Sequence, residues 1–404
     1  RFKVVKISSY KITDFPFWFD KISLFLKKIS EMEKNFSLLG LNTFGFDVKA
    51  KFFEKVQSLD DVRNLIGNQD FKDNLNKSRV LVLSGGSNIL FSSGFYDGFV
   101  VYPDFKGIET LDETAEQVKI RCYGGEVWKD FVDYTVSKNL YGLENLADIP
   151  GKVGAAPVQN IGAYGAEVKD TIYQVHTIDL ATGQTKIFSN EECRFSYRNS
   201  VFKELISDRA THALSQRDDK SLSVGTRHAL YKSDGYPLIF AVDFVLKKHG
   251  ELKLDYGNIR NYLASNGITH PTLQDVATTV KTIRAEKLPE VGVVGSVGSF
   301  FQNAIVSIEK YQEIKQLYPE VPSYPVESAT ASTAMIKIPS GWLIDRAGWK
   351  GYRENHVGVW DKQALVLVHY GGGKPQEILN LMKKIQDSVY QKFGIAIMPE
   401  VNIA

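Results

Sequence analysis

Three side chains in this sequence stand in surroundings that could give them chemistry: Arg198, Ser299 and Glu400. Arg198 lies in the polar segment FSYRNSVFK, Ser299 lies between a glycine and two phenylalanines, and Glu400 follows an apolar segment, residues 395–397, expected to be a strand. A guanidinium can bind a carboxylate, a hydroxyl can act as nucleophile or proton donor, and a carboxylate in apolar surroundings can have a raised pKa. The alternatives are a surface arginine, a hydroxyl bonded to backbone and an exposed carboxylate.

The sequence favours proton donation over nucleophilic attack for Ser299. A nucleophilic serine needs a neighbouring base and an orienting carboxylate. There is no G-x-S-x-G motif, however, and none of the seven histidines has a motif around it. Metal catalysis has no support either, because neither H-E-x-x-H nor a Cys/His/Asp cluster is present. We therefore expect no metal site.

Two glycine-rich segments are candidates for holding a cofactor. In IPGKVGAAPVQNIGAYG (149–165) the glycines would let the main chain approach a ligand, although a tight structural turn fits the composition equally well. SGGSN (84–88) follows an apolar strand and would present backbone N–H groups to an anion such as a pyrophosphate, although a hydroxyl-rich turn looks similar. No G-x-G-x-x-G or G-x-x-x-x-G-K-[ST] motif occurs, so neither a standard Rossmann nor a P-loop domain is supported.

The elements that must position these segments form a mixed pattern of strands and helices. Apolar runs predict strands at 80–83, 99–102, 175–180, 238–246, 335–338, 343–344 and 364–369. Helical spacing predicts helices at 127–140, over 273–283 and over 378–393, the last beginning at Pro375 and ending at Gly394. A change of composition near residues 247–250 predicts a domain boundary.

Composition sets outer limits on the class of protein. The 404 residues allow two or three domains, and a formal net charge of +2 gives no global field for nucleic acid or an anionic membrane. Two cysteines and the lack of an apolar run of about 20 residues favour a cytoplasmic protein without a membrane span. Residues 15–30 predict an amphipathic surface helix within an extension, residues 1–40, and residues 205–234 predict an insertion.

Taken together, the motifs resemble those of the UDP-N-acetylenolpyruvoylglucosamine reductase family. The matching segments are NTFG (42–45), SGGSNIL (84–90), ENLADIPGKVGAAPVQNIGAYGAE (144–167), YRNSVFK (197–203), KLPE (287–290), GSFFQN (298–303) and PEV (399–401). The resemblance extends from about residue 41 to the C-terminus. It leaves out residues 1–40 and the insertion, to which we assign no role.

The resemblance implies an α+β protein. A two-subdomain FAD-binding module of the vanillyl-alcohol-oxidase (PCMH) type would span residues 41–249, and an α+β substrate-binding domain, residues 250–404, would return its last strand to the active site. The residues implied to bind FAD are Ser84, Gly85, Gly86, Ser87, Asn88, Pro150, Gly151, Gly154, Gln159, Asn160, Gly162, Ala163 and Tyr164. Many oxidases of this superfold attach FAD to a histidine in the early glycine loop, where this chain has Asn88, so we expect noncovalent FAD.

The resemblance also implies a reaction, the NADPH-dependent reduction of UDP-N-acetylglucosamine enolpyruvate in peptidoglycan synthesis. Ser299 matches the proton donor, Arg198 the partner of the substrate carboxylate, and Glu400 a carboxylate that orients or polarises the site. Tyr256 and Lys287 match residues that hold the UDP diphosphate, and Asn303 is a candidate for a further contact. We expect a monomer. The alternatives are an FAD-linked sugar or alcohol oxidase of the same superfold and a non-catalytic nucleotide-sugar binding protein. The presence of all three catalytic matches argues against the second alternative.

Overall fold

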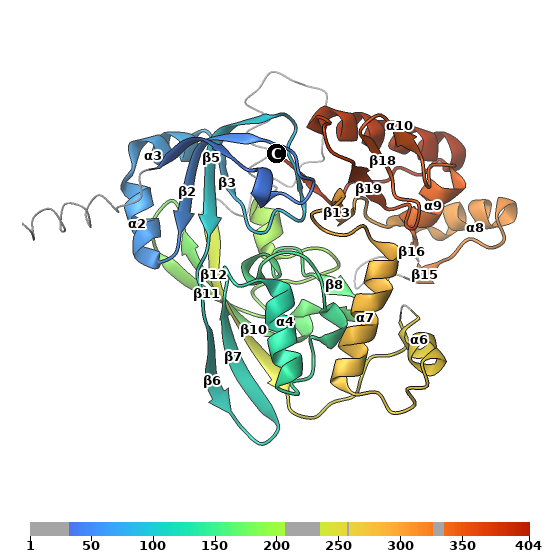
Figure 1. Cartoon of the computed structure of the whole chain (residues 1–404), viewed down its shortest axis with the longest axis horizontal. Helices are drawn as coiled ribbons and strands as arrows, with labels where there is room; N and C mark the ends of the chain where they lie inside the picture. Colours follow the sequence, from blue (N-terminus) through green and yellow to red (C-terminus); the bar gives the residue numbers. More distant parts are fainter. Residues whose placement is uncertain (1–31, 207–234, 257, 326–334) are drawn as a thin grey trace, which may run out of the picture.

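The computed structural model describes residues 32–206, 235–256, 258–325 and 335–404. These residues form two large sheets and a C-terminal region, residues 288–325 and 335–404, which shares a buried core with the first sheet (Figure 1). The predicted helix at 15–30 and nearly all of the predicted insertion lie outside the described residues.

The first sheet has the strand order β1-β2-β5-β3, in which β2, β5 and β3 are parallel and β1 is antiparallel. Its helix α2 begins at a capping box between Ser58 and Asp61, and α3 packs Phe71 edge-on against Phe99. The bounds are β1 Glu33–Ser37, β2 Lys49–Val56, β3 Val80–Val82, β5 Phe95–Pro103, α2 Leu59–Gly67, α3 Gln69–Asn76 and the short 3-10 helix η1 Leu39–Leu41.

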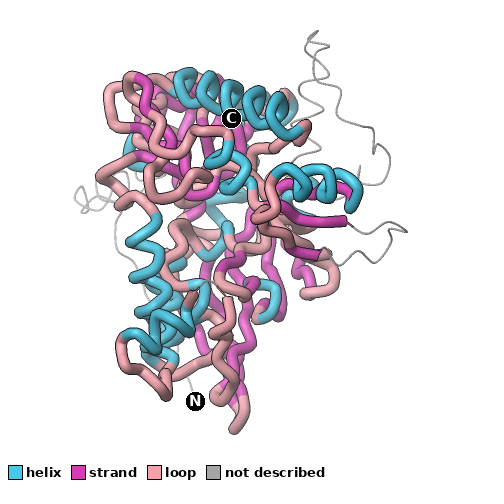
Figure 2. The backbone as a smooth tube through the Cα atoms, turned by 90° about the vertical axis from the view of Figure 1, so that its right-hand side faces the viewer, coloured by secondary structure: helices cyan, strands magenta, loops and turns pink. Residues whose placement is uncertain are grey.

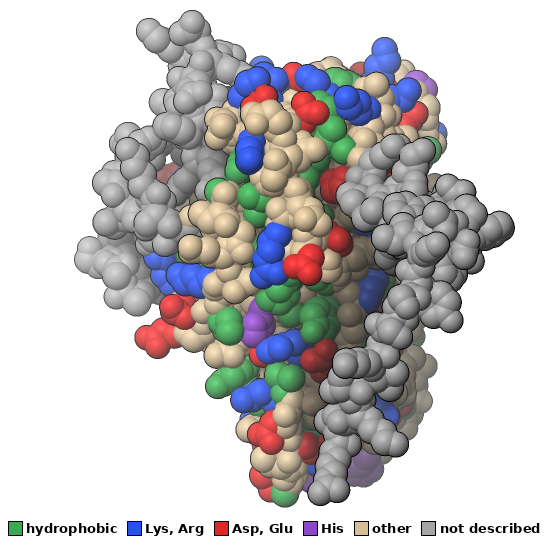
Figure 3. All heavy atoms as spheres, turned by 90° about the vertical axis from the view of Figure 1, so that its left-hand side faces the viewer, with side chains coloured by type: hydrophobic (Ala, Val, Ile, Leu, Met, Phe, Trp, Pro, Cys, Tyr) green, Lys and Arg blue, Asp and Glu red, His purple; other side chains and the backbone are tan. Residues whose placement is uncertain are grey.

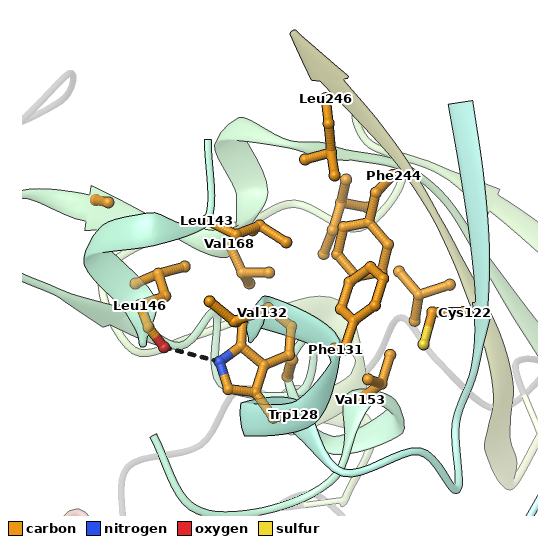
Figure 4. Close-up of a cluster of buried hydrophobic side chains, with 14 of the residues drawn as sticks. Cys122, Trp128, Phe131, Val132, Leu143, Leu146, Val153, Val168, Phe244 and Leu246 are labelled. Atoms are coloured by element: carbon orange, nitrogen blue, oxygen red, sulfur yellow. Dashed lines mark hydrogen bonds between the residues drawn. The ribbon is translucent and has the colours of Figure 1, made fainter. Parts of the chain in front are cut away.

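The second sheet is antiparallel, with the order β11-β10-β12-β7-β6. Helix α4 covers one face, where Phe131 packs on Phe244 and the indole Nε1 of Trp128 donates to the Leu146 carbonyl at 2.9 Å (Figure 4). The bounds are β6 Ile108–Glu113, β7 Gln117–Tyr123, β10 Ile172–Asp179, β11 Thr185–Ser189, β12 Pro237–Lys247, α4 Trp128–Ser137 and the 3-10 helices η2 Glu144–Leu146, η3 Val153–Ala155 and η4 Val168–Asp170.

Helices α6 (Ile259–Ser265) and α7 (Leu273–Lys287) pack with the second sheet rather than with the C-terminal region. Ile259 and Leu263 of α6 and Val276, Val280 and Ile283 of α7 belong to the same buried cluster as Trp128 and Phe244. The helical spacing predicted for 273–283 is therefore the face that α7 buries against this core.

The described part of the C-terminal region contains the small sheets β13-β19-β18-β17 and β14-β16-β15 and the helices α8, α9 and α10. Helix α10 begins at Pro375, ends at Gly394 with a positive φ of 65°, and runs along the outer edge of the region (Figure 2). The bounds are β13 Gly295–Ser299, β14 Ala304–Ser307, β15 Tyr324–Pro325, β16 Met335–Ile338, β17 Arg353–Glu354, β18 Val357–Val359, β19 Val366–His369, α8 Ile308–Leu317, α9 Ser340–Arg346 and α10 Pro375–Phe393.

Two strand predictions in this region are wrong. Leu343 and Ile344 are buried on helix α9, because an apolar pair is too short to distinguish a strand from one turn of helix. Residues 395–397 lie outside any strand, and the terminal strand is β20 (Asn402–Ile403). This strand pairs in parallel with β4 (Ile89–Leu90), which brings the C-terminal segment to the glycine loop of the first sheet.

The distribution of charged side chains on the surface reflects the nearly equal numbers of basic and acidic residues, 49 and 47. Figure 3 shows acidic and basic side chains interspersed over the left-hand side of the molecule. Within the ranges described, the structure has no helix with the length and apolarity needed to cross a membrane. The same residues bring together no group of three or more His, Cys, Asp or Glu side chains that could hold a metal ion.

Candidate active site

A cleft of about 2130 Å³ lies where the two sheets meet the C-terminal region. Its walls include the loop after β3, the glycine-rich stretch at 149–164, the end of α7, β13 and the C-terminal segment. Every residue predicted to bind cofactor or substrate, or to take part in catalysis, lines this cleft, with the exception of Asn160. The fold therefore brings together segments that are more than 300 positions apart in the sequence.

The two glycine-rich segments touch each other through their backbones. A Cβ on Gly85 would lie 2.7 Å from Cα of Gly151, closer than real Cβ contacts, and Gly151 itself has a φ of 125°. Ser87 Oγ donates to the carbonyl of Pro150 at 3.0 Å. Glycine is thus required here for loop-to-loop packing, and the packed loops form one wall of the cleft.

Polar groups on this wall suit a ligand rich in acceptors. Ser84 Oγ is buried and has no hydrogen-bond partner among the described residues, which is uncommon for a native polar group unless a ligand or water satisfies it. Asn88 Nδ2 donates to Gln159 Oε1 at 2.6 Å, and Asn402 N donates to the Asn88 carbonyl at 3.2 Å. Asn88 therefore joins the first loop, the glycine-rich stretch and the C-terminal segment.

Asn160 supports the stretch from behind. It is completely buried, donates to Glu167 Oε2 and the Ser196 carbonyl, and accepts from the backbone N–H of Lys169 at 3.1 Å. Its side chain is thus already occupied by protein groups. The sequence motif alone could not reveal this, because neighbouring residues in the motif face the cleft.

Arg198 sits at the tip of a tight two-residue turn between Ser196 and Asn199, whose backbone groups bond each other in both directions. Its φ of 53° is unusual for a residue with a side chain and costs on the order of 1–3 kcal/mol. Strain of this kind persists only when surrounding contacts hold it.

Three hydrogen bonds fasten the turn to the glycine-rich stretch. Ser200 Oγ donates to the Val158 carbonyl at 2.5 Å, Asn160 Nδ2 donates to the Ser196 carbonyl at 3.1 Å, and Arg198 Nη2 donates to the Gly162 carbonyl at 2.8 Å. Ser200 was not predicted as a site residue, and its position in YRNSVFK was the only signal that could have identified it.

Glu400 faces Arg198 in the cleft. The distance from Arg198 Nε to Glu400 Oε1 is 2.8 Å, but the Nε–H direction is poorly aligned, so the contact is an ion pair rather than a hydrogen bond. The Glu400 side chain is only 11% exposed. Burial raises the pKa of Glu400, while Arg198 and Lys203 act in the opposite direction. This carboxylate therefore holds a proton more readily than an exposed glutamate.

Ser299 ends β13 and lies beside the segment that carries Glu400. A register irregularity between Ser296 and Ser299 disturbs the pairing of β13 with β19, and the Ser299 side chain is exposed. Phe300, the next residue, accepts a backbone hydrogen bond from the N–H of Glu400 at 2.8 Å. A hydroxyl and a buried carboxylate are thereby placed on adjoining segments of one wall.

The predicted substrate residues lie around the mouth of the cleft. Asn303 Nδ2 reaches the Tyr197 hydroxyl at 3.4 Å, and its Oδ1 accepts from the Ser340 backbone N–H at 3.2 Å. Tyr256 is 55% exposed and packs beside Gly165, and Lys287 ends α7. These positions are open to a ligand.

Several further cations line the cleft without having been predicted as site residues, among them Arg284 and Lys337. Arg284 on α7 donates from Nε to the Asp148 carbonyl at 3.2 Å, and burial lowers its pKa. Lys337 on β16 holds Nζ 4.8 Å from the centre of the Tyr197 ring. Neither residue lies in the part of a motif that sequence reasoning singled out.

Comparison with known proteins decides the family. Residues 289–404 match the family model "UDP-N-acetylenolpyruvoylglucosamine reductase, C-terminal domain", and residues 55–189 match "FAD binding domain". The UDP-N-acetylenolpyruvoylglucosamine reductase of Flavobacterium johnsoniae is 39% identical over 373 residues, covering 92% of this chain and 99% of that protein. The enzyme of the same name from Bacteroides fragilis is 41% identical over 372 residues, with the same coverage. This chain belongs to the UDP-N-acetylenolpyruvoylglucosamine reductase family.

A solved structure supports the fold assignment. The UDP-N-acetylenolpyruvylglucosamine reductase of Thermus caldophilus aligns over 92% of this chain and 98% of its own, with a TM-score of 0.56 at 18% sequence identity. The predicted fold class, a two-subdomain FAD-binding module followed by an α+β domain, is confirmed. The prediction that this member of the reductase family uses FAD is confirmed as well.

The cleft residues fit FAD. An unpartnered buried hydroxyl at Ser84, the packed glycine loops and the amides of Asn88 and Gln159 form a wall of donors and exposed backbone. In this reductase family member, the residues that would hold the cofactor are those of the loop after β3 and of the stretch at 150–164.

Gly85→Ala is expected to weaken FAD binding by about 10-fold or more and to lower the unfolding temperature. The new Cβ would push the two loops apart, and overpacking of this kind costs about 1–3 kcal/mol. Flavin fluorescence during titration of FAD-depleted protein measures the dissociation constant. Gly67→Ala is the matched control, because a Cβ there meets nothing within 4 Å. Unchanged FAD affinity in Gly85→Ala would contradict the packing argument.

Proposed function

We propose that this chain reduces UDP-N-acetylglucosamine enolpyruvate to UDP-N-acetylmuramate with NADPH, through noncovalently bound FAD, in the cytoplasm. The reaction and its coenzymes are those of the family to which the chain belongs. The single observation that carries the assignment of roles is the meeting of Arg198, Glu400 and Ser299 in one cleft with the glycine-rich wall. Noncovalent binding rests on the presence of Asn88 where a linking histidine would stand.

The chemistry that FAD supplies when bound is transfer of a hydride from NADPH to C3 of the enolpyruvyl vinyl group. Negative charge then develops at C2 and on the adjoining carboxylate. Arg198 stabilises that charge through its guanidinium, which is held at a fixed place by Gly162 and Glu400. Stabilisation that grows in the transition state lowers the barrier.

Ser299 donates the proton to C2. A serine hydroxyl is a weak acid, so its loss of a proton must be assisted by neighbours. Glu400 lies on the adjoining segment and has a raised pKa, which suits a group that returns a proton to the serine or polarises it. We assign Ser299 as the donor and Glu400 as its partner.

The UDP portion would lie toward the mouth of the cleft. Tyr256, Lys287 and Asn303 are the proposed contacts, since all three line the cleft. Lys287 supplies the positive charge that a diphosphate requires. The proposed FAD contacts are those predicted from sequence except Asn160, whose side chain we assign to supporting the stretch.

The proposed domain division follows the packing. We place the FAD-binding module at residues 41–287, since α6 and α7 share the core of the second sheet, and the substrate-binding domain at 288–404, whose core also includes residues of the first sheet. The proposed boundary therefore lies after helices α6 and α7, at residue 287, rather than near residue 249, where the sequence predicted it. We propose a monomer, and residues 1–40 receive no role.

The test is an anaerobic assay in two steps. The purified protein should be yellow, NADPH should bleach the flavin, and UDP-N-acetylglucosamine enolpyruvate should restore the colour, with the flavin released by acid. Rapid recovery of the flavin colour in oxygen, without the enolpyruvyl compound, would favour the oxidase alternative. Failure of the enolpyruvyl compound to restore the colour would refute the proposed function.

A further inference from the structure

Lys203 lies five residues after Arg198, in the helical residues 201–206 that follow the tight turn. Its Nζ donates to the backbone carbonyl of Arg198 at 2.9 Å. The side chain is half-buried and lines the same cleft as Ser299 and Glu400. None of the roles assigned above uses this cation.

The hydrogen bond from Lys203 is made to a residue with a strained backbone conformation. Arg198 has a φ of 53°, and the backbone pair between Ser196 and Asn199 closes the turn around it. The direction of the Arg198 carbonyl depends on this left-handed conformation, because rotation to an ordinary φ turns the adjoining peptide units. A donor fixed on that carbonyl therefore selects the strained conformation.

The guanidinium depends on the same backbone. From this backbone position, Arg198 reaches both the Gly162 carbonyl and the Glu400 carboxylate. If the turn relaxed, at least one of these contacts would be lost, and the guanidinium would leave the place where the substrate carboxylate is to bind. A displacement of about 1 Å in a positioning contact can cost on the order of 100-fold in rate.

Lys203 also completes the charge balance of the site. Two cations, Arg198 and Lys203, face one buried carboxylate, Glu400, so the group carries one surplus positive charge when all three are ionised. A surplus positive charge suits a ligand that presents a carboxylate of its own. Burial lowers the pKa of Lys203, the neighbouring Arg198 lowers it further, and Glu400 acts in the opposite direction.

We infer that Lys203 is a positioning residue for the enolpyruvyl half-reaction: it holds the strained turn so that the Arg198 guanidinium meets the substrate carboxylate. The inference rests on the proposed function and names a residue that acts through Arg198 rather than on the substrate. The NADPH half-reaction does not use the enolpyruvyl carboxylate, so it should not depend on Lys203.

Lys203→Met, which removes the donor and keeps the length of the side chain, is the main test. Reduction of the flavin by NADPH should stay within about threefold of wild type, while oxidation by the enolpyruvyl compound should slow about 10- to 100-fold. Lys203→Arg should restore most of the rate, because a guanidinium can also donate to the carbonyl. Lys383→Met, on the exposed side of α10, is the matched control.

A double-mutant cycle separates positioning from direct contact. In an Arg198→Gly background, whose backbone adopts the left-handed conformation without strain, Lys203→Met should slow the enolpyruvyl half-reaction less than about threefold further. If its full effect persists in that background, or if both half-reactions slow equally in Lys203→Met, the inference is overturned. Should Lys203→Met fail to fold, the same cycle is run with Lys203→Gln.

The wild-type protein distinguishes the two possible failures. If wild-type flavin is not reoxidised by the enolpyruvyl compound, the proposed function fails. If it is, and Lys203→Met reacts at the wild-type rate, only the role of Lys203 fails.

Discussion

Ser299→Ala will leave reduction of the flavin by NADPH within about threefold of wild type but slow its oxidation by UDP-N-acetylglucosamine enolpyruvate by about 10²–10⁴-fold. The hydroxyl ends β13 in the cleft, beside the segment of Glu400, and it has no role in FAD binding in our assignment. Its removal takes away the proton that C2 requires after hydride transfer. Stopped-flow absorbance of the flavin, without oxygen, measures the two half-reactions separately.

The control for this variant is Ser137→Ala, at an exposed position that ends α4 and does not line the cleft. Ser299→Ala should also retain the wild-type unfolding temperature, because the side chain is exposed and bonds nothing within the described part of the chain. If Ser299→Ala slowed both half-reactions equally, the hydroxyl would be structural, and the proton would have to come from another group.

The elements of this fold were predictable where apolar periodicity was long. Helix α10 repeats apolar residues at helical spacing from Ile378 to Phe393 and ends at a glycine with positive φ, so both its length and its end could be predicted. Leu343 and Ile344 show the limit of such reasoning. Two apolar residues define no period, and the structure places them on one turn of α9.

The sequence was sufficient to identify the segments that form the site, but not the contacts between them. The glycines of both loops were identified from composition, yet the contact between Gly85 and Gly151 joins residues 66 positions apart and follows only from tertiary packing. The motif likewise could not separate Asn160, which bonds protein groups, from Gln159, which faces the cleft. In each case local sequence specifies the residue type, while the tertiary fold decides which side it presents.

Lys203 was missed for a related reason. A lysine at the end of YRNSVFK looks like a surface charge, and its importance depends on the left-handed conformation of Arg198. Non-glycine residues adopt that conformation too rarely for sequence to predict it. The left-handed conformation of Arg198 lies beside the largely buried Glu400 carboxylate, and this placement motivates the role proposed for the turn.

Arg198→Gly is expected to slow the enolpyruvyl half-reaction by about 10²–10³-fold, the effect of losing one preorganised donor to a developing anion. Glycine at this position tolerates the φ of 53°, so the variant removes the guanidinium and leaves the turn in place. The unfolding temperature should therefore change little, although Glu400 loses its ion-pair partner and its pKa should rise further.

Arg198→Lys sharpens this test. It keeps a positive charge near Glu400 but lacks the planar fork that can bind a carboxylate while donating to Gly162. Its rate should lie between those of wild type and Arg198→Gly. Arg63→Ala on α2, where Arg63 forms an ion pair with exposed Asp60, is the control for loss of an arginine. If Arg198→Gly reoxidised its flavin with the enolpyruvyl compound at the wild-type rate, the guanidinium would have no role in that step. Other cations of the cleft would then have to stabilise the developing anion. The test thus decides whether the strained turn serves catalysis or only the packing of the glycine-rich stretch.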